Sequence, residues 1–317
     1  MYISFIVIGK NEGLKLDRCF NSVVNFSLQN NFDYETIYID SQSTDNTQEV
    51  LREWPTIRHK ILGGKCNAAR ARNLGASLSK GDVLCFVDGD MELLSSFGEK
   101  ISSEGKLIHP FINGYRVDYL HLSNWEYISD NSVEIKLNLK DKYMITTGGL
   151  FIIEKKLWER VDGMDNRLAA YEDNDLAYRV YISEGIKILK LGDILANHYT
   201  INYTDISRFK TMVKGNYFKY KGVLLRKHIL DVKLWFHFVK GNISFFVLLF
   251  SLILTIFHSY FLLAYLIASL SRLFFIKKSK DSTPYLDRFF LNILADIKIL
   301  AGAFTFFPVN YKPTEKK

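Results

Sequence analysis

Three short acidic stretches follow or precede apolar runs of the kind that form buried β-strands. They occur in the order Asp40–Asp45, Asp88–Asp90 and Glu172–Asp175. Ligands of parallel sheets bind beyond the carboxyl ends of the strands, so each stretch is expected at the edge where binding takes place. A nucleotide, a divalent metal ion and an acceptor hydroxyl each require carboxylates there. The combination carries the prediction, because single pairs of Asp residues are common.

The second stretch predicts a metal site. Asp88 and Asp90 follow the apolar run Val83–Val87 and are separated only by Gly89. Two carboxylates at this spacing can share a hard divalent cation, while diphosphate oxygens complete its coordination. An ordinary Asp-Gly turn is the alternative, and the position at a strand end favours the metal.

The first stretch, Asp40–Asp45, can be interpreted in two ways. Ser43 or Thr44 is expected to cap a helix that begins at Asp45. The carboxylate of Asp40, at the end of a strand, can also accept a hydrogen bond from a nucleobase imide or a ribose hydroxyl. Capping and nucleotide binding are compatible in one turn.

A basic helix start lies between these two stretches. Residues 67–78 form an Ala-rich predicted helix that carries Arg70 and Arg72. A cation at this position can face a phosphate. At least one of the two is expected to be an ordinary solvated arginine. Arg72 is preferred as the functional one, because Asn73 and Gly75 follow it.

The third stretch predicts an acid–base group. A charged first turn is the plain explanation for Glu172–Asp175, since helix N-termini favour acidic residues. One of them can instead act as a general base, with its proton affinity raised by the neighbouring carboxylates. His198 is more simply a structural residue, yet its imidazole could complete a carboxylate metal site.

The elements that must position these residues alternate between strands and helices. This alternation predicts an α/β domain with a parallel sheet and helices on both faces. Residues 107–145 are expected to be mixed strands and loops. The predicted strands are 3–8, 36–39, 83–87 and 150–153, and the predicted helices are 14–28, 45–54, 67–78, 155–161 and 174–184.

Basic and acidic residues are unevenly distributed along the chain. Residues 1–204 carry 23 Lys and Arg against 28 Asp and Glu, whereas residues 205–240 carry nine basic residues against Asp205 and Asp231. The apolar stretch 243–276 follows the basic one. A basic segment next to an apolar one predicts association with an anionic membrane surface. Nucleic-acid binding is disfavoured, because no nucleic-acid-binding module accompanies the charge.

The apolar stretch is too long for one simple membrane span. Its 34 residues would form a helix of about 51 Å, against a hydrocarbon core of about 30 Å. A helical hairpin that turns near His258 and Ser259 fits best, and a single tilted span is the alternative. Residues 289–307 predict an interfacial amphipathic helix, with a soluble core helix as the alternative. The expected divisions are 1–204 for the catalytic domain, 205–240 for a basic juxtamembrane segment, 241–276 for a transmembrane or re-entrant hairpin, and 277–317 for the interfacial helix and basic tail.

The cysteines and the N-terminus bear on location. Cys19, Cys66 and Cys85 are scattered and lack metal-ligand spacing, which suggests a reducing compartment. The first residues lack the basic leader of a signal peptide. The catalytic domain is therefore expected on the cytoplasmic side of the inner (plasma) membrane.

Over roughly residues 2–200 the chain resembles the family 2 glycosyltransferases, inverting enzymes with the GT-A fold. The C-terminal segments resemble those of membrane-attached members that build surface polysaccharides. Two departures occur: Ile-Gly-Lys-Asn-Glu stands where Pro-x-Tyr-Asn-Glu is usual, and Asn174-Asp175 adds a second acidic candidate. The motifs that carry the resemblance are Phe5–Glu12, Ile39–Thr47, Ala69–Gly75, Asp88/Asp90, Gly148-Gly149, Gly163–Asp165 and Glu172-Asp173.

The resemblance implies a GT-A fold with a mostly parallel central sheet. It also implies transfer of a sugar from a nucleotide-diphosphate sugar, with UDP favoured, to a hydroxyl of a glycan or lipid-linked oligosaccharide. Asp173 would be the general base with Glu172 beside it, and Asp175 is the second candidate. The implied donor-binding residues are Gly9, Glu12, Asp40, Ser43, Arg72 and Asp88, and the implied ligands of Mn²⁺ or Mg²⁺ are Asp90, Asp88 and His198.

Two other functions are alternatives, and a third is disfavoured. Transfer of a sugar to polyprenyl phosphate is the alternative enzyme, although an anionic acceptor has less need of a base. A non-catalytic, nucleotide-binding membrane scaffold is the alternative from another class. An NAD-dependent oxidoreductase is disfavoured, because no G-x-G-x-x-G follows the first strand.

Overall fold

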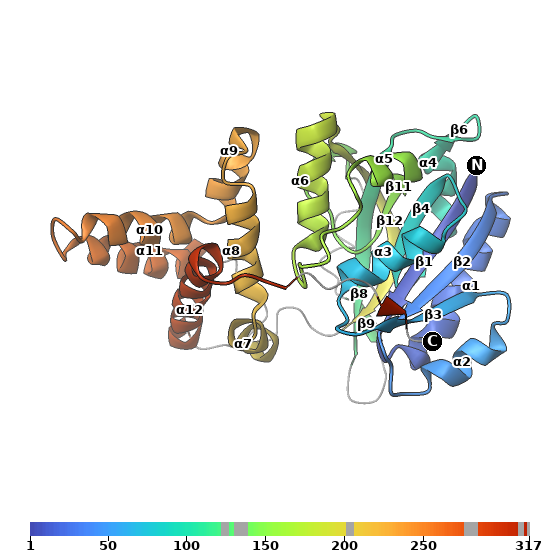
Figure 1. Cartoon of the computed structure of the whole chain (residues 1–317), viewed down its shortest axis with the longest axis horizontal. Coiled ribbons are helices and arrows are strands. Elements are labelled where there is room, and N and C mark those ends of the chain that lie inside the picture. The colour runs from blue at the N-terminus through green and yellow to red at the C-terminus, as the bar shows by residue number, and fades with distance from the viewer. Residues whose placement is uncertain (122–126, 130–138, 201–205, 276–284, 310–313, 316–317) are drawn as a thin grey trace. The chain divides into compact units, whose positions relative to one another are not determined.

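The structure, a computed structural model, describes residues 1–121, 127–129, 139–200, 206–275, 285–309 and 314–315. The chain divides into two compact units. The first comprises residues 1–201 and 310–317, and the second comprises residues 202–309. The first unit contains all the predicted site residues, and Figure 1 shows its sheet and helices.

The first half of the first unit follows the predicted alternation. Strands β1, β2, β3 and β4 pair in parallel in the order β4-β1-β2-β3. Their carboxyl ends therefore meet at one edge, as expected. Strand β3 was not predicted. The elements are β1 (Tyr2–Gly9), α1 (Gly13–Gln29), β2 (Asp33–Asp40), α2 (Thr47–Glu53), β3 (Arg58–Gly63), α3 (Ala68–Leu78) and β4 (Val83–Asp88).

The second half makes the sheet mixed rather than mostly parallel. Strand β11 runs antiparallel to both β4 and β8, and β12 runs parallel to β8. Direction was not predictable, because a buried strand is apolar whichever way it runs. The elements are β5 (Met91–Leu93), the 3₁₀ helix η1 (Ser95–Phe97), α4 (Gly98–Ile101), β6 (Ser102–Ser103), β7 (Lys106–Leu107), β8 (Phe111–His121), β9 (Tyr127–Ser129), β10 (Lys142–Met144), β11 (Phe151–Glu154), α5 (Lys155–Arg160), α6 (Glu172–Glu184) and β12 (Ile188–Thr200). A short strand β13 (Thr314–Glu315) pairs with β3.

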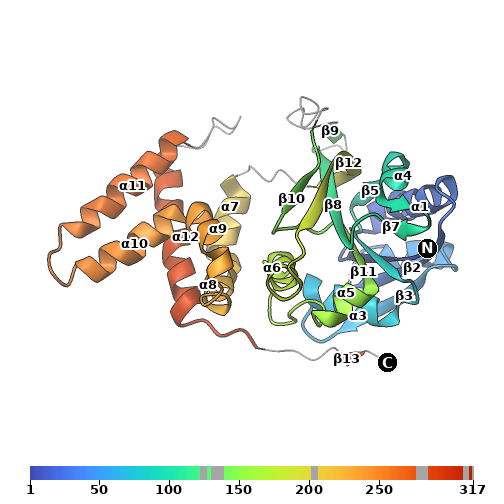
Figure 2. The same cartoon turned by 90° about the horizontal axis from the view of Figure 1, so that it is seen from above.

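Helices cover both faces of this sheet, as predicted, and Figure 2 shows the two layers. Phe5 and Val7 of β1 pack with α1 and α2, while Ile6 and Ile8 pack with α3, α5 and α6. Alternation of buried side chains along one strand is what a sheet covered on both sides requires. Helix α3 comes very close to the sheet at Gly75, where a Cβ would lie 2.3 Å from Cγ2 of Ile6.

The second unit is helical. Its elements are α7 (Ile206–Lys214), α8 (Tyr217–Lys227), α9 (Val232–Gly241), α10 (Ile243–Leu254), α11 (Phe261–Phe275) and α12 (Tyr285–Phe304). Helices α10 and α11 pack together and are joined by residues 255–260, where the expected hairpin turns. Within the described ranges, no single helix has the length and apolarity to cross a bilayer. Helices α9 and α10 reach that length and apolarity only together, with a 98° bend between them.

Helix α12 packs within the second unit through two charged residues, and its predicted interfacial position stays a prediction. The two charged residues that interrupt its apolar pattern do not form an outer polar face. Asp296 is buried and accepts a hydrogen bond of 3.2 Å from the hydroxyl of Tyr265. Lys298 donates to the carbonyls of Lys214 and Gly215 at the end of α7. Both side chains therefore serve packing within the second unit.

Candidate functional site

Asp40 organises the turn after β2. The residue is buried, and its Oδ1 accepts hydrogen bonds from the backbone N–H of Ser43 at 3.0 Å and from the Ser43 hydroxyl at 2.6 Å. Its Oδ2 accepts from Nε2 of Gln48 at 2.8 Å. The carboxylate thus fixes the turn that would border a nucleotide. Direct contact of Asp40 and Ser43 with the donor stays a prediction.

The helix after this turn begins later than predicted. Helix α2 starts at Thr47, whose N–H donates to Oδ1 of Asp45 at 3.1 Å. Ser43 and Thr44 are not its caps, because both are held by Asn11. The N–H of Asn11 donates to Oγ of Ser43 at 2.8 Å, and its Oδ1 accepts from the N–H of Thr44 at 2.8 Å.

Gly9 and Glu12 lie at the same edge of the sheet. A Cβ on Gly9 would lie 2.7 Å from the hydroxyl of Tyr38, so a larger residue would have to displace that side chain. Glu12 forms an ion pair of 2.5 Å with Lys15. Burial, together with the nearby charges of Asp90 and Asp88, raises the pKa of Glu12 despite this lysine. Glu12 therefore belongs to the acidic cluster at the end of β4.

Arg72 joins the second acidic stretch to the third. Its Nη2 lies 2.8 Å from Oδ1 of Asp88, and its Nη1 lies 2.9 Å from Oε1 of Glu172. The side chain of Arg72 is 4% exposed. Burial opposes its charge, but the attraction of Asp88, Glu172 and Asp173 outweighs this and raises the pKa of Arg72. Arg72 thus positions two carboxylates, whereas the sequence suggested a cation that faces phosphate.

Arg70 corrects a second expectation about this helix. It is 1% exposed, and its Nη2 donates to the carbonyl of Gly63 at 3.0 Å, with a further bond from Nη1 to the carbonyl of Lys65. Neither arginine is solvated. Arg70 ties the start of α3 to the end of β3, a role that an Ala-rich helix pattern does not reveal.

Gly149 packs directly against the Arg72–Asp88 pair. A Cβ at this position would lie 2.3 Å from Oδ2 of Asp88 and 3.0 Å from Nη2 of Arg72. The Gly148-Gly149 motif therefore lets the backbone before β11 approach the carboxylate at the end of β4. This close approach explains why the motif occurs together with Asp88.

Asp90 lies beside His198, as predicted, and a third residue completes the group. Nε2 of His198 is 3.2 Å from Oδ2 of Asp90, and Nδ1 is 2.7 Å from Oδ1 of Asp118. Burial alone would lower the pKa of His198, but hydrogen bonds to the two carboxylates raise it. Asp118 was not predicted. It reaches His198 because β8 and β12 pair in a register that places these two residues opposite each other.

The structure supports a metal ion at Asp90 more clearly than it supports the complete predicted ligand set of Asp90, Asp88 and His198. Oδ1 of Asp90 is buried and makes no hydrogen bond, as expected of an oxygen reserved for a cation. Carboxylate oxygens are also the ligands that Mg²⁺ and Mn²⁺ prefer. Among the residues that the structure describes, however, no three His, Cys, Asp or Glu side chains are grouped closely enough to hold an ion. His198 is already engaged on both ring nitrogens, so Mn²⁺ or Mg²⁺ at Asp90 and Asp88 stays a prediction.

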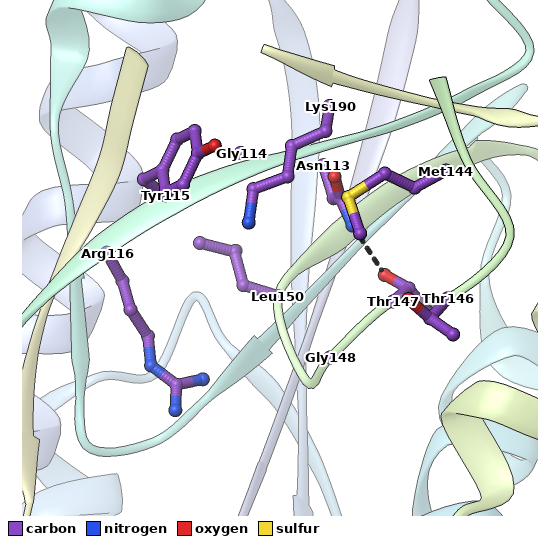
Figure 3. Close-up of a pocket in the computed structure, with 10 residues that line it drawn as sticks. All are labelled: Asn113, Gly114, Tyr115, Arg116, Met144, Thr146, Thr147, Gly148, Leu150 and Lys190. Atoms are coloured by element: carbon purple, nitrogen blue, oxygen red, sulfur yellow. Dashed lines mark hydrogen bonds between the residues drawn. The ribbon is translucent and has the colours of Figure 1, made fainter. Parts of the chain in front are cut away.

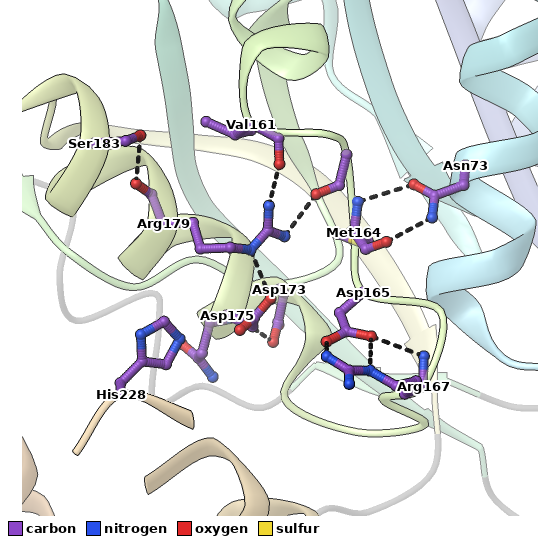
Figure 4. Close-up of polar contacts among 12 residues, drawn as sticks. Asn73, Val161, Met164, Asp165, Arg167, Asp173, Asp175, Arg179, Ser183 and His228 are labelled. Atoms are coloured by element: carbon purple, nitrogen blue, oxygen red, sulfur yellow. Dashed lines mark hydrogen bonds and ion pairs between the residues drawn. The ribbon is translucent and has the colours of Figure 1, made fainter. Parts of the chain in front are cut away.

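The structure distinguishes Asp173 from Asp175. Burial and the adjacent Glu172 raise the pKa of Asp173 to about 7. Asp175 is fully buried, and its Oδ2 accepts from Nε of Arg179 at 2.8 Å. Arg179 also donates to the carbonyls of Val161 and Gly163, so Asp175 is part of the packing of α6 (Figure 4). The carboxylate of Asp175 is thus engaged within the fold, and the role of Asp173 as a general base stays a prediction.

The loop before α6 is clamped to α3. Asn73 donates from Nδ2 to the carbonyl of Met164 at 2.7 Å and accepts from the N–H of Met164 at 2.9 Å (Figure 4). Gly163 has a φ of +57°, and a Cβ there would lie 2.6 Å from Oδ1 of Asn73. These contacts explain the Asn73 and Gly163-Met164 motifs as parts of one joint, which sets the start of α6 and therefore Asp173.

Comparison with known proteins agrees with this geometry. Residues 4–104 match the model of the glycosyl transferase family 2. Poly(ribitol-phosphate) beta-N-acetylglucosaminyltransferase TarP of Staphylococcus aureus (strain N315) is 34% identical over 113 residues, which cover 32% of this chain and 34% of that protein. Glycosyltransferase AglE of Haloferax volcanii is 30% identical over 93 residues, or 28% of this chain and 30% of that protein. The match therefore spans about a third of the length of these curated relatives.

A solved structure extends the likeness in fold. The crystal structure of S. aureus TarS 1-349 aligns with 96% of this chain and 81% of that chain, at a TM-score of 0.53 and 14% identity. At this identity the likeness concerns the fold alone. The matched residues include Gly9, Asp40, Asp88 and Asp90 at one edge of the sheet, together with Arg72 of α3, which contacts Asp88. The chain carries a glycosyl transferase family 2 domain, to which residues 4–104 belong.

Proposed function

We propose that this chain is an inverting glycosyltransferase that moves a sugar from a nucleotide-diphosphate sugar, with UDP favoured, to a hydroxyl of a glycan or lipid-linked acceptor in surface polysaccharide assembly. The observation that carries the proposal is the bridge through Arg72. One buried guanidinium holds Asp88, on the donor side, and Glu172, the neighbour of the base Asp173. The names of the relatives TarP and AglE support the same class of activity.

The arrangement suits a single displacement with inversion. Asp173 takes the proton of an acceptor hydroxyl, and the oxygen attacks C1 of the donor sugar on the face opposite the leaving diphosphate. Inversion needs one base and no carboxylate nucleophile, so Asp173 suffices. Arg72 fixes Glu172, which precedes the base in the first turn of α6. A Mn²⁺ or Mg²⁺ ion at Asp90, with Asp88 and His198 beside it, would supply charge stabilisation for the leaving diphosphate.

Two alternatives make different demands on Asp173. A polyprenyl-phosphate acceptor is already anionic, so a base with a pKa near neutrality would have little to do. A nucleotide-binding scaffold would need no base at all. The raised pKa of Asp173 favours transfer to a hydroxyl over both.

The first test is release of nucleotide from a panel of UDP-, GDP- and CMP-sugars by the purified full-length chain, with Mn²⁺ or Mg²⁺ and a membrane-lipid extract. We expect release from one donor, loss of that release with EDTA, and loss in Asp90→Ala. Asp193→Ala is the matched control, because Asp193 pairs with the exposed Lys100. Binding of a nucleotide-sugar without release from any donor would instead support the scaffold.

We further propose that the second unit attaches the chain to the inner face of an anionic membrane. Large apolar side chains are strongly exposed on it, among them Leu230 at 89%, Ile256 at 81%, Phe236 at 79% and Phe257 at 78%. Strongly exposed large apolar side chains, accompanied by basic residues, are typical of interfacial binding.

Co-sedimentation with phosphatidylglycerol vesicles tests the attachment. Phe236→Ser combined with Phe257→Ser should weaken binding about tenfold or more, because each buried aromatic side chain contributes roughly 1.5–3 kcal/mol. Leu14→Ser, which removes an exposed apolar residue of the first unit, is the control. An absence of vesicle binding by the unaltered chain at low salt would refute the proposal.

A further inference from the structure

Asp118, His198 and Asp90 form a row in which a buried ring lies between two carboxylates. Oδ1 of Asp118 lies 2.7 Å from Nδ1 of His198, and Nε2 of the same ring lies 3.2 Å from Oδ2 of Asp90. The side chain of His198 is 3% exposed, whereas those of Asp118 and Asp90 are 29% and 16% exposed. The ring therefore connects two carboxylates that both remain partly accessible.

Strand β12 carries His198 between the segments that hold its two partners. On one side, β12 pairs with β8 in a register that places His198 opposite Asp118. On the other side, β12 pairs with β5 at Met91, directly after Asp90, and the N–H of Tyr199 donates to the carbonyl of Asp90 at 2.8 Å. The backbone sets where the ring lies. The torsion angle that turns an imidazole is soft, so contacts at its two nitrogens must fix the direction of Nε2.

A second contact fixes Asp118 itself. Nε of Arg116 lies 3.1 Å from Oδ1 of Asp118, the oxygen that also faces His198. Residues two apart on a strand point to the same face, which brings Arg116 and Asp118 together on β8. Arg116 also lines a cavity of about 320 Å³ bounded by β8, β12 and the segment before β11 (Figure 3). Asp118 is thus held between Arg116 on its own strand and His198 on the next.

A carboxylate in this position has a known effect in metal sites. When it accepts a hydrogen bond from one nitrogen of a histidine, it fixes the orientation of the ring and the tautomer. Here the carboxylate of Asp118 faces Nδ1, so the ring presents Nε2 to Asp90, the residue predicted to bind Mn²⁺ or Mg²⁺.

We propose that Asp118 is a positioning residue for the predicted cation site, which accepts a hydrogen bond from Nδ1 of His198 and so directs Nε2 at the carboxylate of Asp90. The inference rests on the proposed function, in which Asp90 holds the cation. Asp118 acts through His198 and contacts neither the ion nor the substrate.

Mn²⁺ binding to the full-length chain, followed by electron paramagnetic resonance with and without UDP, tests this role independently of turnover. Asp118→Ala removes the acceptor and should weaken Mn²⁺ binding about 10–100-fold, as is typical for such partners. Asp118→Asn keeps an oxygen that can accept from Nδ1 and should recover most of the lost affinity. Equal losses in the two variants would overturn the proposal, because they would show that only the charge matters.

Removal of His198 shows whether Asp118 acts through it. His198→Ala should weaken Mn²⁺ binding, and addition of Asp118→Ala to that variant should cause no further loss. A further loss equal to that of Asp118→Ala alone would overturn the proposal, because independent contributions add.

Asp193→Ala is the matched control. It removes a partly exposed carboxylate, paired with Lys100, from the strand that carries His198, and it should leave Mn²⁺ affinity unchanged. Thermal melting of each variant separates lost binding from lost folding.

Two results distinguish this inference from the proposed function. Nucleotide release that persists in EDTA, together with no Mn²⁺ binding by the unaltered chain, would overturn the role of Asp118 and leave the glycosyltransferase assignment intact. Mn²⁺ binding with the expected loss in Asp118→Ala, but without nucleotide release from any donor, would support the role of Asp118 and count against sugar transfer.

Discussion

Asp173→Asn should lower turnover by about 10²–10⁴-fold and leave the dissociation constant of the nucleotide-sugar nearly unchanged. Asparagine keeps the size of the side chain but cannot take a proton from the acceptor hydroxyl. Asp173 is not a partner of the Arg72 bridge, which uses Asp88 and Glu172, so the frame of the site persists in the variant. Steady-state kinetics combined with donor titration measures both quantities.

The pH dependence of the rate provides a second measurement of the same group. Burial and Glu172 raise the pKa of Asp173 to about 7, whereas an ordinary aspartate ionises near 3.9. The base works only when ionised, so the rate should fall as the pH is lowered through about 7. The residual rate of Asp173→Asn should lack this decline.

Asp175→Asn is the control for position. Its carboxylate is fully buried and paired with Arg179, so the change should lower the melting temperature more than it lowers turnover per folded molecule. Full activity in Asp173→Asn, together with a collapse of turnover in a folded Asp175→Asn, would transfer the role of base to Asp175.

The acidic stretches were predictable because each depends on local sequence. Asp88 and Asp90 follow a buried apolar run, and Asp173 lies in the first turn of a helix, so a strand end and a helix start suffice to place them. The parallel pairing of β1, β2 and β4 then brings Gly9, Asp40 and Asp88 to one edge. Short-range patterns and one topological rule account for these positions.

The residues that escaped prediction depend on long-range pairing. Asp118 meets His198 only through the register of β8 and β12, which are separated by more than 60 residues. Strand β12 was itself missed, because Gly192, Asp193 and Asn197 interrupt its apolar pattern. The direction of β11 was missed for a different reason, since antiparallel and parallel buried strands have the same composition.

Arg72 has two partners that its position in the sequence did not indicate. Its place at the start of a helix suggested a phosphate ligand, and that inference considered only the residues near it in sequence. Glu172 lies 100 residues further along and arrives through the joint between Asn73 and Met164. The structure shows ion pairs of Arg72 with Asp88 and Glu172, and its contact with the diphosphate of a donor stays a prediction.

Arg72→Leu should destabilise the first unit by about 3–5 kcal/mol, because removing one member of a buried ion pair leaves the other charge uncompensated. Here two carboxylates, Asp88 and Glu172, lose their partner at once, and 4% exposure of the arginine gives water little access to replace it. The melting temperature should fall by roughly 6–20 °C, measured by circular dichroism. Arg160→Leu removes an exposed ion pair with Glu184 and should change stability by no more than about 1 kcal/mol. Equal melting temperatures for the two variants would show that the bridge is not a structural element. Arg72 would then be available for the phosphate contact that its sequence position first suggested.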